Sequence, residues 1–248
     1  MTHDCRVVRG RITRLLGVIL SAVLLGGCAS AIEGTPARRQ ATGLQTVLPT
    51  PEQVNQAVGN RLDPTGPAAV GSIDLLPNGI RDGSQVTPAE CLGPATPLMQ
   101  AVYQNGDVTG VALRDFARFG EGLTVSSAHT GVVRFGSDAE AMRMFEGFVA
   151  QWRACEGVPV TVAITPTAAL RWTVTDVRVD GTVLSATILS GETDQEPAFP
   201  TEHAVGVAAD CIVDVDVAVT DVLASRRVAA GRAADLVRLM LDNVESLR

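Results

Sequence analysis

Residues 131–155 read GVVRFGSDAEAMRMFEGFVAQWRAC, and this stretch decides the fold. The β-branched run His129–Phe135 predicts a strand. Ser137 then stands directly before a helical pattern, and Glu140 follows it at the three-residue spacing of a capping box. The apolar residues of the helix recur at three- and four-residue steps: Met142, Phe145, Val149 and Trp152. They predict an amphipathic helix with one apolar stripe, and Cys155 just beyond the stripe predicts a covalent anchor at the helix end.

The remainder of the chain is rich in strand signals. Alternation or β-branched enrichment marks seven runs: Val108–Phe116, His129–Phe135, Pro159–Ile164, Arg171–Val179, Thr182–Leu189, His203–Ala208 and Cys211–Val219. Asp180-Gly181 is a strong hairpin signal, and Ala209-Asp210 predicts a second tight turn. A last helix is expected from about Arg226 to Val244, with an apolar face made of Ala229, Ala233, Leu236, Met240 and Val244. Strands joined by hairpins, with a central and a C-terminal helix packed on the sheet, predict an antiparallel α+β domain.

The strand patterns also predict which side chains face inward. In Cys211–Val219 the odd positions are Cys211 and four valines, whereas Asp214 and Asp216 occupy even positions. A strand buried on one face accounts for this pattern and places Cys211 inside. His129 shares its phase with Val133 and Phe135, which predicts an inward histidine. The apolar phase slips within Arg171–Val179, which predicts a bulge near Thr175-Asp176.

The first 28 residues predict an export signal. Arginines at 6, 9, 11 and 14 precede an apolar run from Leu15 to Leu25. A basic region before about a dozen apolar residues is typical of a secretory signal. Leu25-Gly26-Gly27-Cys28 is similar to a bacterial lipobox, so Cys28 is the expected lipid acceptor. Two or more acyl chains would hold the protein stably on the membrane. An ordinary signal peptide with a coincidental cysteine is the alternative.

The chain is therefore expected to have three parts: a signal peptide (1–27), a lipidated tether (28–47) and one folded domain (48–248). Short helices are expected from Pro51, behind the N-cap Thr50, and near Met99. The apolar content of 46% with only 4% aromatic residues predicts an aliphatic core. The net charge of −7 argues against binding to nucleic acids.

Three cysteines of the expected mature domain are left after Cys28: Cys91, Cys155 and Cys211. An oxidising compartment favours a disulfide between two of them. We favour Cys91–Cys155, because each lies at a loop or helix end, whereas Cys211 is phased into a valine-lined strand. A Cys155–Cys211 bridge is the rival.

These motifs resemble the PknH-like extracellular sensor domain family of mycobacterial kinase ectodomains and secreted lipoproteins. The resemblance covers roughly residues 45–247. It is carried by Val132 and Phe135, Ser137, Trp152 and Cys155, Pro88–Gly93, Pro97, Tyr103 and Val213-Asp214-Val215. The resemblance implies a strongly twisted antiparallel sheet with helices packed on it, a groove for an unidentified extracytoplasmic ligand, and the Cys91–Cys155 bridge.

The sequence departs from the family pattern in its last third. Family members usually carry a second cysteine pair around the final hairpin, whereas His203 and Ala218–Thr220 occupy these regions here. Cys211 stands where an Asn is common. The second bridge is therefore expected to be absent.

Signals for catalysis are weak. The sequence has no G-x-S-x-G, Gly-rich phosphate loop, C-x-x-C or H-E-x-x-H motif. Nothing in the spacing supports a Ser–His–Asp site around His129, so an envelope hydrolase is the least favoured function. Asp210, Asp214 and Asp216 share one strand face and could ligate a metal, but a solvated acidic face is the preferred interpretation. We expect no enzyme activity and no cofactor.

Ligand binding is the preferred function. We expect a sensor-type lipoprotein on the extracytoplasmic side of the cell membrane, with a small molecule, a lipid or a cell-wall component as ligand. The candidate ligand-binding residues are Tyr103, His129, Arg134, Trp172 and Asp214. Among these, Arg134 alternates with inward residues, which favours solvent or an ion pair. A structural or protein-interaction lipoprotein, using the sheet edge or the acidic face, is the alternative.

Overall fold

A computed structural model describes residues 43–80, 85–165, 168–192, 199–220 and 231–247. The expected signal peptide and Cys28 lie outside these residues. No helix within the described ranges is long and apolar enough to span a membrane.

The core of the domain is one antiparallel sheet. Within the described ranges its strands follow the order β1-β4-β5-β10-β9-β8-β7-β6-β3, and β2 pairs with β4. Their bounds are β1 (Asp63–Pro64), β2 (Ala69–Gly71), β3 (Val86–Thr87), β4 (Val108–Ala117), β5 (Val125–Phe135), β6 (Pro159–Thr165), β7 (Ala168–Asp180), β8 (Val183–Glu192), β9 (Phe199–Ala208) and β10 (Cys211–Val219). Every predicted strand is present, and the predicted antiparallel α+β class is confirmed.

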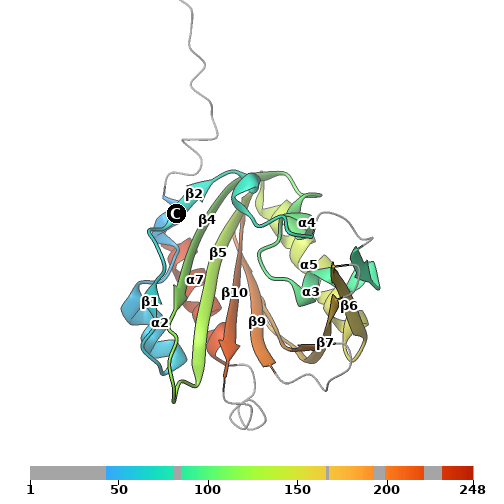
Figure 1. The fold of residues 1–248 in the computed structure, drawn as a ribbon. Helices are drawn as coiled ribbons and strands as arrows, with labels where there is room; N and C mark the ends of the chain where they lie inside the picture. Colours follow the sequence, from blue (N-terminus) through green and yellow to red (C-terminus); the bar gives the residue numbers. More distant parts are fainter. Residues whose placement is uncertain (1–42, 81–84, 166–167, 193–198, 221–230, 248) are drawn as a thin grey trace, which may run out of the picture. The chain divides into compact units, whose positions relative to one another are not determined.

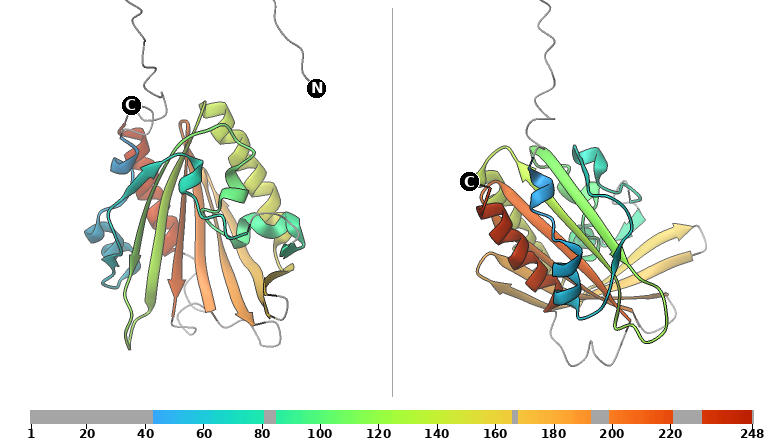
Figure 2. Two further views of the ribbon diagram at one scale, coloured as in Figure 1. Left: turned by 45° about the horizontal axis from the view of Figure 1, so that its top comes forward. Right: turned by 90° about the vertical axis from the view of Figure 1, so that its left-hand side faces the viewer.

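Two helices cover opposite faces of the sheet (Figure 1, Figure 2). Helix α5 (Asp138–Cys155) packs on β5, β10, β9 and β7, and α7 (Arg232–Glu245) packs on β10, β9 and β8. The strands at the β6 end cross those at the β4 end at a wide angle, so the sheet is strongly twisted (Figure 2). The central strands are therefore buried from both sides.

Helix α5 begins as predicted, but its buried face differs from the predicted one. The Ser137 hydroxyl accepts a hydrogen bond from the Glu140 amide at 3.3 Å. The expected stripe included Met142, which is 41% exposed. The buried side chains are Ala141, Phe145, Phe148, Trp152 and Cys155. The prediction for Met142 was wrong because the three- and four-residue spacing also connects Phe145 to Ala141 and Phe148. It is this neighbouring face of the helix that packs on the sheet.

The prediction that β10 is buried on one face only was also wrong. Its odd positions, beginning with Cys211, pack beneath α7 as expected. Its even positions Ile212 and Asp214 are buried as well, because the α5 layer covers the opposite face. Only toward the end of the strand, at Asp216, does this second face become partly accessible.

The predicted turns and the predicted bulge are present. Gly181 adopts a left-handed conformation (φ 59°) in the turn that joins β7 to β8, and Ala209 does so (φ 53°) between β9 and β10. The register of β7 against β8 shifts between Thr175 and Arg178, where Asp176 has φ 56°.

The folded domain begins before the expected residue 48. Leu44 of a 3-10 turn, η1 (Leu44–Thr46), and Val47 are fully buried in the α7-side core. Helix α2 (Pro51–Val58) follows, and Thr50 and Gln53 form its predicted capping box. Shorter elements complete the chain between β2 and β4: η2 (Ile73–Leu75), η4 (Ala89–Cys91), α3 (Leu92–Ala95) and α4 (Gln100–Tyr103).

The N-terminus of α7 is held by a buried carboxylate. Glu202 on β9 is 3% exposed. It accepts hydrogen bonds from the amides of Arg232 (2.8 Å) and Ala233 (3.3 Å) and pairs with the Arg232 guanidinium at 2.5 Å. The negative charge also faces the positive end of the helix dipole. This contact ties the helix to the sheet.

We predict that Glu202→Gln destabilises the domain by about 2–3 kcal/mol, because it leaves the half-buried Arg232 guanidinium without its counter-charge. Urea unfolding would measure the change. Glu245→Gln, an exposed substitution on the same helix, should stay within about 0.5 kcal/mol of the parent. Equal effects of the two substitutions would contradict this role of Glu202.

Candidate functional site

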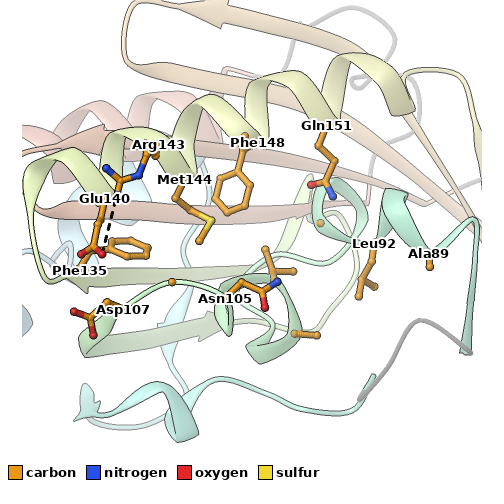
Figure 3. A pocket seen from close by; sticks show the side chains of 15 residues that line it. Ala89, Leu92, Asn105, Asp107, Phe135, Glu140, Arg143, Met144, Phe148 and Gln151 are labelled. Carbon is orange, nitrogen blue, oxygen red and sulfur yellow. Dashed lines mark ion pairs between the residues drawn. The ribbon is translucent and has the colours of Figure 1, made fainter.

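A groove of about 510 Å³ lies between α5 and the chain that runs from η4 to the start of β4 (Figure 3). One wall is a flank of α5, and the other is formed by residues of Ala89–Asp107. Phe135, the last residue of β5, also lines the groove. The volume is within the range that is usual for small-molecule sites.

The α5 wall is built by helical periodicity. The residues that face the groove recur at three- and four-residue steps: Glu140, Arg143, Met144, Gly147, Phe148 and Gln151. This stripe runs beside the buried one and shares Phe148 with it. A Cβ atom added to Gly147 would have no heavy atom within 4 Å, so the absent side chain of this glycine leaves the middle of the groove open.

The groove is fastened at both ends. At one end the Cys91–Cys155 disulfide joins the two walls, and Gln151 Nε2 donates to the Glu90 carbonyl at 2.6 Å. The preferred cysteine pairing is thus confirmed, and Cys211 is a buried free thiol. At a sequence separation of 64 between its cysteines, the bridge contributes about 4 kcal/mol in the chain-entropy model.

The other end is closed by backbone contacts. The Gly136 amide donates to the Asp107 carbonyl at 3.0 Å. Next to it, a Cβ atom at Gly106 would lie only 2.6 Å from the Phe135 ring, so a glycine is needed for this close approach.

Behind the η4–β4 wall lies a buried polar cluster around Asp214, which is 2% exposed. Asp214 Oδ2 accepts hydrogen bonds from the Tyr103 hydroxyl (2.6 Å) and the Leu98 amide (3.1 Å). Asp214 Oδ1 lies 2.9 Å from His203 Nε2, and His203 Nδ1 lies 2.9 Å from the Pro94 carbonyl. The cluster therefore connects the wall to the central strands β9 and β10.

The hydrogen-bond partners of His203 and Asp214 indicate that the two side chains form an ion pair. The Pro94 carbonyl can only accept, so His203 Nδ1 carries a proton. Asp214 Oδ2 already accepts two hydrogen bonds, which favours the carboxylate, so His203 Nε2 donates as well. Burial opposes the charge on His203, but the charge and hydrogen bond of Asp214 outweigh it and raise the pKa of His203. The imidazolium lies 4.4 Å from the Trp152 ring, between centroids, which adds a cation–π contact.

Three further ionisable residues extend from this cluster across the same sheet face. His129 on β5 is the direct neighbour of Asp115 on β4 and of Asp216 on β10, and Asp216 is the neighbour of His203. The hydrogen bond from His129 Nδ1 to Asp115 (3.0 Å) raises the pKa of His129 to about 9, against the effect of burial. Burial raises the pKa of Asp216 to about 6, against the effect of the two histidines.

The five candidate residues from the sequence fall into different places. Tyr103 and Asp214 are in direct contact in the buried cluster. His129 lies on the same sheet face, but its side chain is 46% exposed, so the expectation that it faces inward was wrong. Trp172 on β7 is half-buried against the α5-side core. Arg134 has the opposite phase on β5 and pairs with Asp210 at 3.5 Å, as its alternation suggested.

Sequence reasoning placed Asp214 in a solvated acidic face, which was wrong, did not single out His203, and expected a groove from the family resemblance without locating it. The strand phase that His203 shares with Val205 and Val207 could have identified it as buried. The only sequence signal for the position of the groove is the second set of α5 residues that recur at three- and four-residue steps, from Glu140 to Gln151. Within the described ranges, no three His, Cys, Asp or Glu side chains are grouped so that they could hold a metal ion.

The sequence profile of the PknH-like extracellular domain matches residues 40–243. The chain belongs to this family. The crystal structure of the extracellular domain of PknH from Mycobacterium tuberculosis has the same fold, with a TM-score of 0.67 and 18% identity over 83% of this chain and 96% of that one. An uncharacterized protein from Mycobacterium smegmatis aligns over the same shares with 12% identity and a TM-score of 0.37. No curated protein matches the sequence.

We predict that Asp214→Asn destabilises this PknH-like domain by about 3 kcal/mol, because it leaves the buried His203 without its counter-charge. Tyr103→Phe removes a single donor and should cost about 1.5 kcal/mol. Urea unfolding would measure both. The exposed Asp242→Asn serves as the control and should change little. If Asp214→Asn proved as mild as the control, the proposed ion pair would be wrong.

His129 should titrate at about pH 9 by NMR. Because its pKa is higher in the folded than in the unfolded protein, its contribution to stability is complete below about pH 6.5 and is lost as the pH rises to about 9. Asp115→Asn removes the carboxylate whose hydrogen bond is the main cause of the raised pKa of His129. The substitution should therefore lower this pKa and weaken the pH dependence of stability. A pKa that stays at about 9 in Asp115→Asn would show that another group holds the proton.

Proposed function

We propose that this protein is a lipid-anchored, extracytoplasmic, sensor-type domain that binds a small ligand in the groove beside α5 and performs no catalysis. The observation that carries the proposal is the groove itself, which stays open at Gly147 between two walls that are fixed to each other. Membership of a family of extracellular domains supports the location. The lipobox-like Leu25–Cys28 supports the anchor.

The construction of the groove suits ligand binding. Apolar side chains, among them Phe135, Phe148 and Leu92, line it along its length, and polar side chains lie at both ends and, with Asn105, between them (Figure 3). Such a combination provides burial for part of a ligand and orientation for its polar groups. Because the disulfide and the Asp214 cluster hold the η4–β4 wall, little ordering is needed on binding, and this preorganisation favours affinity.

The anchor can be tested by metabolic labelling. Cells fed radiolabelled palmitate should incorporate it into the protein, and Cys28→Ala should abolish the label and release the protein from the membrane fraction. Two acyl chains give stable anchoring, so the released fraction should be large. Cys5→Ala is the control and should leave the label unchanged. Unlabelled protein that stays on the membrane would refute lipidation.

The groove can be tested by native mass spectrometry of protein released from its own membranes. We expect a co-purifying ligand in the parent and its loss in Gly147→Leu, whose side chain would occupy the groove. Gly147→Ala is the matched control: its methyl group enters open space and should raise stability by about 0.8 kcal/mol through helix propensity. A ligand that is retained by Gly147→Leu would place the site elsewhere.

A further inference from the structure

The two ends of the groove differ in charge. Asp107 and Glu140 meet above Gly136, where a Cβ atom would lie 2.5 Å from Asp107 Oδ2 and 2.9 Å from Glu140 Oε2. Within the described ranges, no cation pairs with Asp107. Arg143 approaches Glu140 only to 3.9 Å, and its side chain is 67% exposed. This end of the groove therefore carries one net negative charge.

The opposite end is uncharged. Leu92, Ala89 and the Gln151 amide line it, and the Gln151 amide nitrogen is already bonded to the Glu90 carbonyl. Met144, Phe148 and the polar Asn105 lie between the two ends (Figure 3), and the open position at Gly147 stands between Met144 and Phe148 on α5. From Glu140 to Gln151 the helix rises about 16 Å, so the groove is an elongated trough along α5.

We infer that the groove binds a linear cationic amphiphile. A primary ammonium or guanidinium group lies between Asp107 and Glu140, and an aliphatic chain runs past Met144 and Gly147 toward Leu92. Charge complementarity selects the cation, because the two carboxylates at this end outnumber the single Arg143 guanidinium. The apolar side chains of Met144 and Phe148 and the length of the trough select the aliphatic chain. This inference rests on the proposed function of the groove as the ligand site.

Octylammonium chloride is a direct probe of this chemistry, with octanoate and octanol as the anionic and neutral comparisons. The full-length protein would be held in lipid nanodiscs, labelled at the methionine methyl groups and titrated by NMR, with empty nanodiscs as the blank. Met144 lines the groove, whereas Met142 lies on the exposed flank of α5 and Met240 is a buried residue of α7 on the other face of the sheet. We expect octylammonium to shift the Met144 signal and leave the signals of Met142 and Met240 unchanged.

Variants separate the charged contact from the apolar one. Asp107→Asn combined with Glu140→Gln should weaken octylammonium binding at least about tenfold and leave octanol binding unchanged, because only the charge-assisted contacts are removed. Glu146→Gln, on the same helix but outside the groove, is the control and should have no effect. Added salt should weaken octylammonium binding and spare octanol.

Three results would overturn the inference: octanoate binding as tightly as octylammonium, no response of Met144 to octylammonium, or full affinity in the Asp107→Asn, Glu140→Gln double variant. These results are distinct from a failure of the proposed function. If Gly147→Leu displaced the co-purifying ligand while octylammonium left Met144 unchanged, the groove would be the site and the ligand class would be wrong. If Gly147→Leu displaced nothing, the groove itself would be refuted.

Discussion

The burial of the Asp214 carboxylate is the constraint on which the rest of this domain depends. A charge in the interior is tolerated only if hydrogen bonds and an opposite charge compensate for the lost water. Here Tyr103, the Leu98 amide and His203 provide that compensation. Leu98 lies between α3 and α4, and Tyr103 is the last residue of α4, so the compensation also determines where the wall of the groove lies.

The groove follows from this constraint together with three glycines. Gly106 and Gly136 bring the end of the wall close to β5, and Gly147 leaves the helix surface empty between the two fixed ends. A glycine inside a helix lowers its stability by up to about 1 kcal/mol relative to alanine. The two walls of the groove are thus joined at both ends. Helix α5 is locally less stable at Gly147, which lies between those ends in the open part of the groove.

Much of the fold could be predicted from the sequence, because alternation, capping residues and turn residues act locally. The strands from β4 to β10, the bulge at Asp176 and the cap at Ser137 all follow from such local rules. What failed was inference about burial. Asp214 and Asp216 have the same phase, yet Asp214 is enclosed by Tyr103 from a distant part of the chain and by His203 on the neighbouring strand, whereas Asp216 is partly accessible. Only the tertiary arrangement separates them.

The Cys91–Cys155 bridge can form only in a suitable redox environment. A thiol pair stays reduced in the cytosol and closes only in an oxidising compartment. Before that closure, the two walls at this end are held by the hydrogen bond from Gln151 to the Glu90 carbonyl and by apolar packing around Leu92. The covalent link between the two walls of the groove therefore depends on an oxidising environment, and in the reduced chain this end of the groove relies on non-covalent contacts alone.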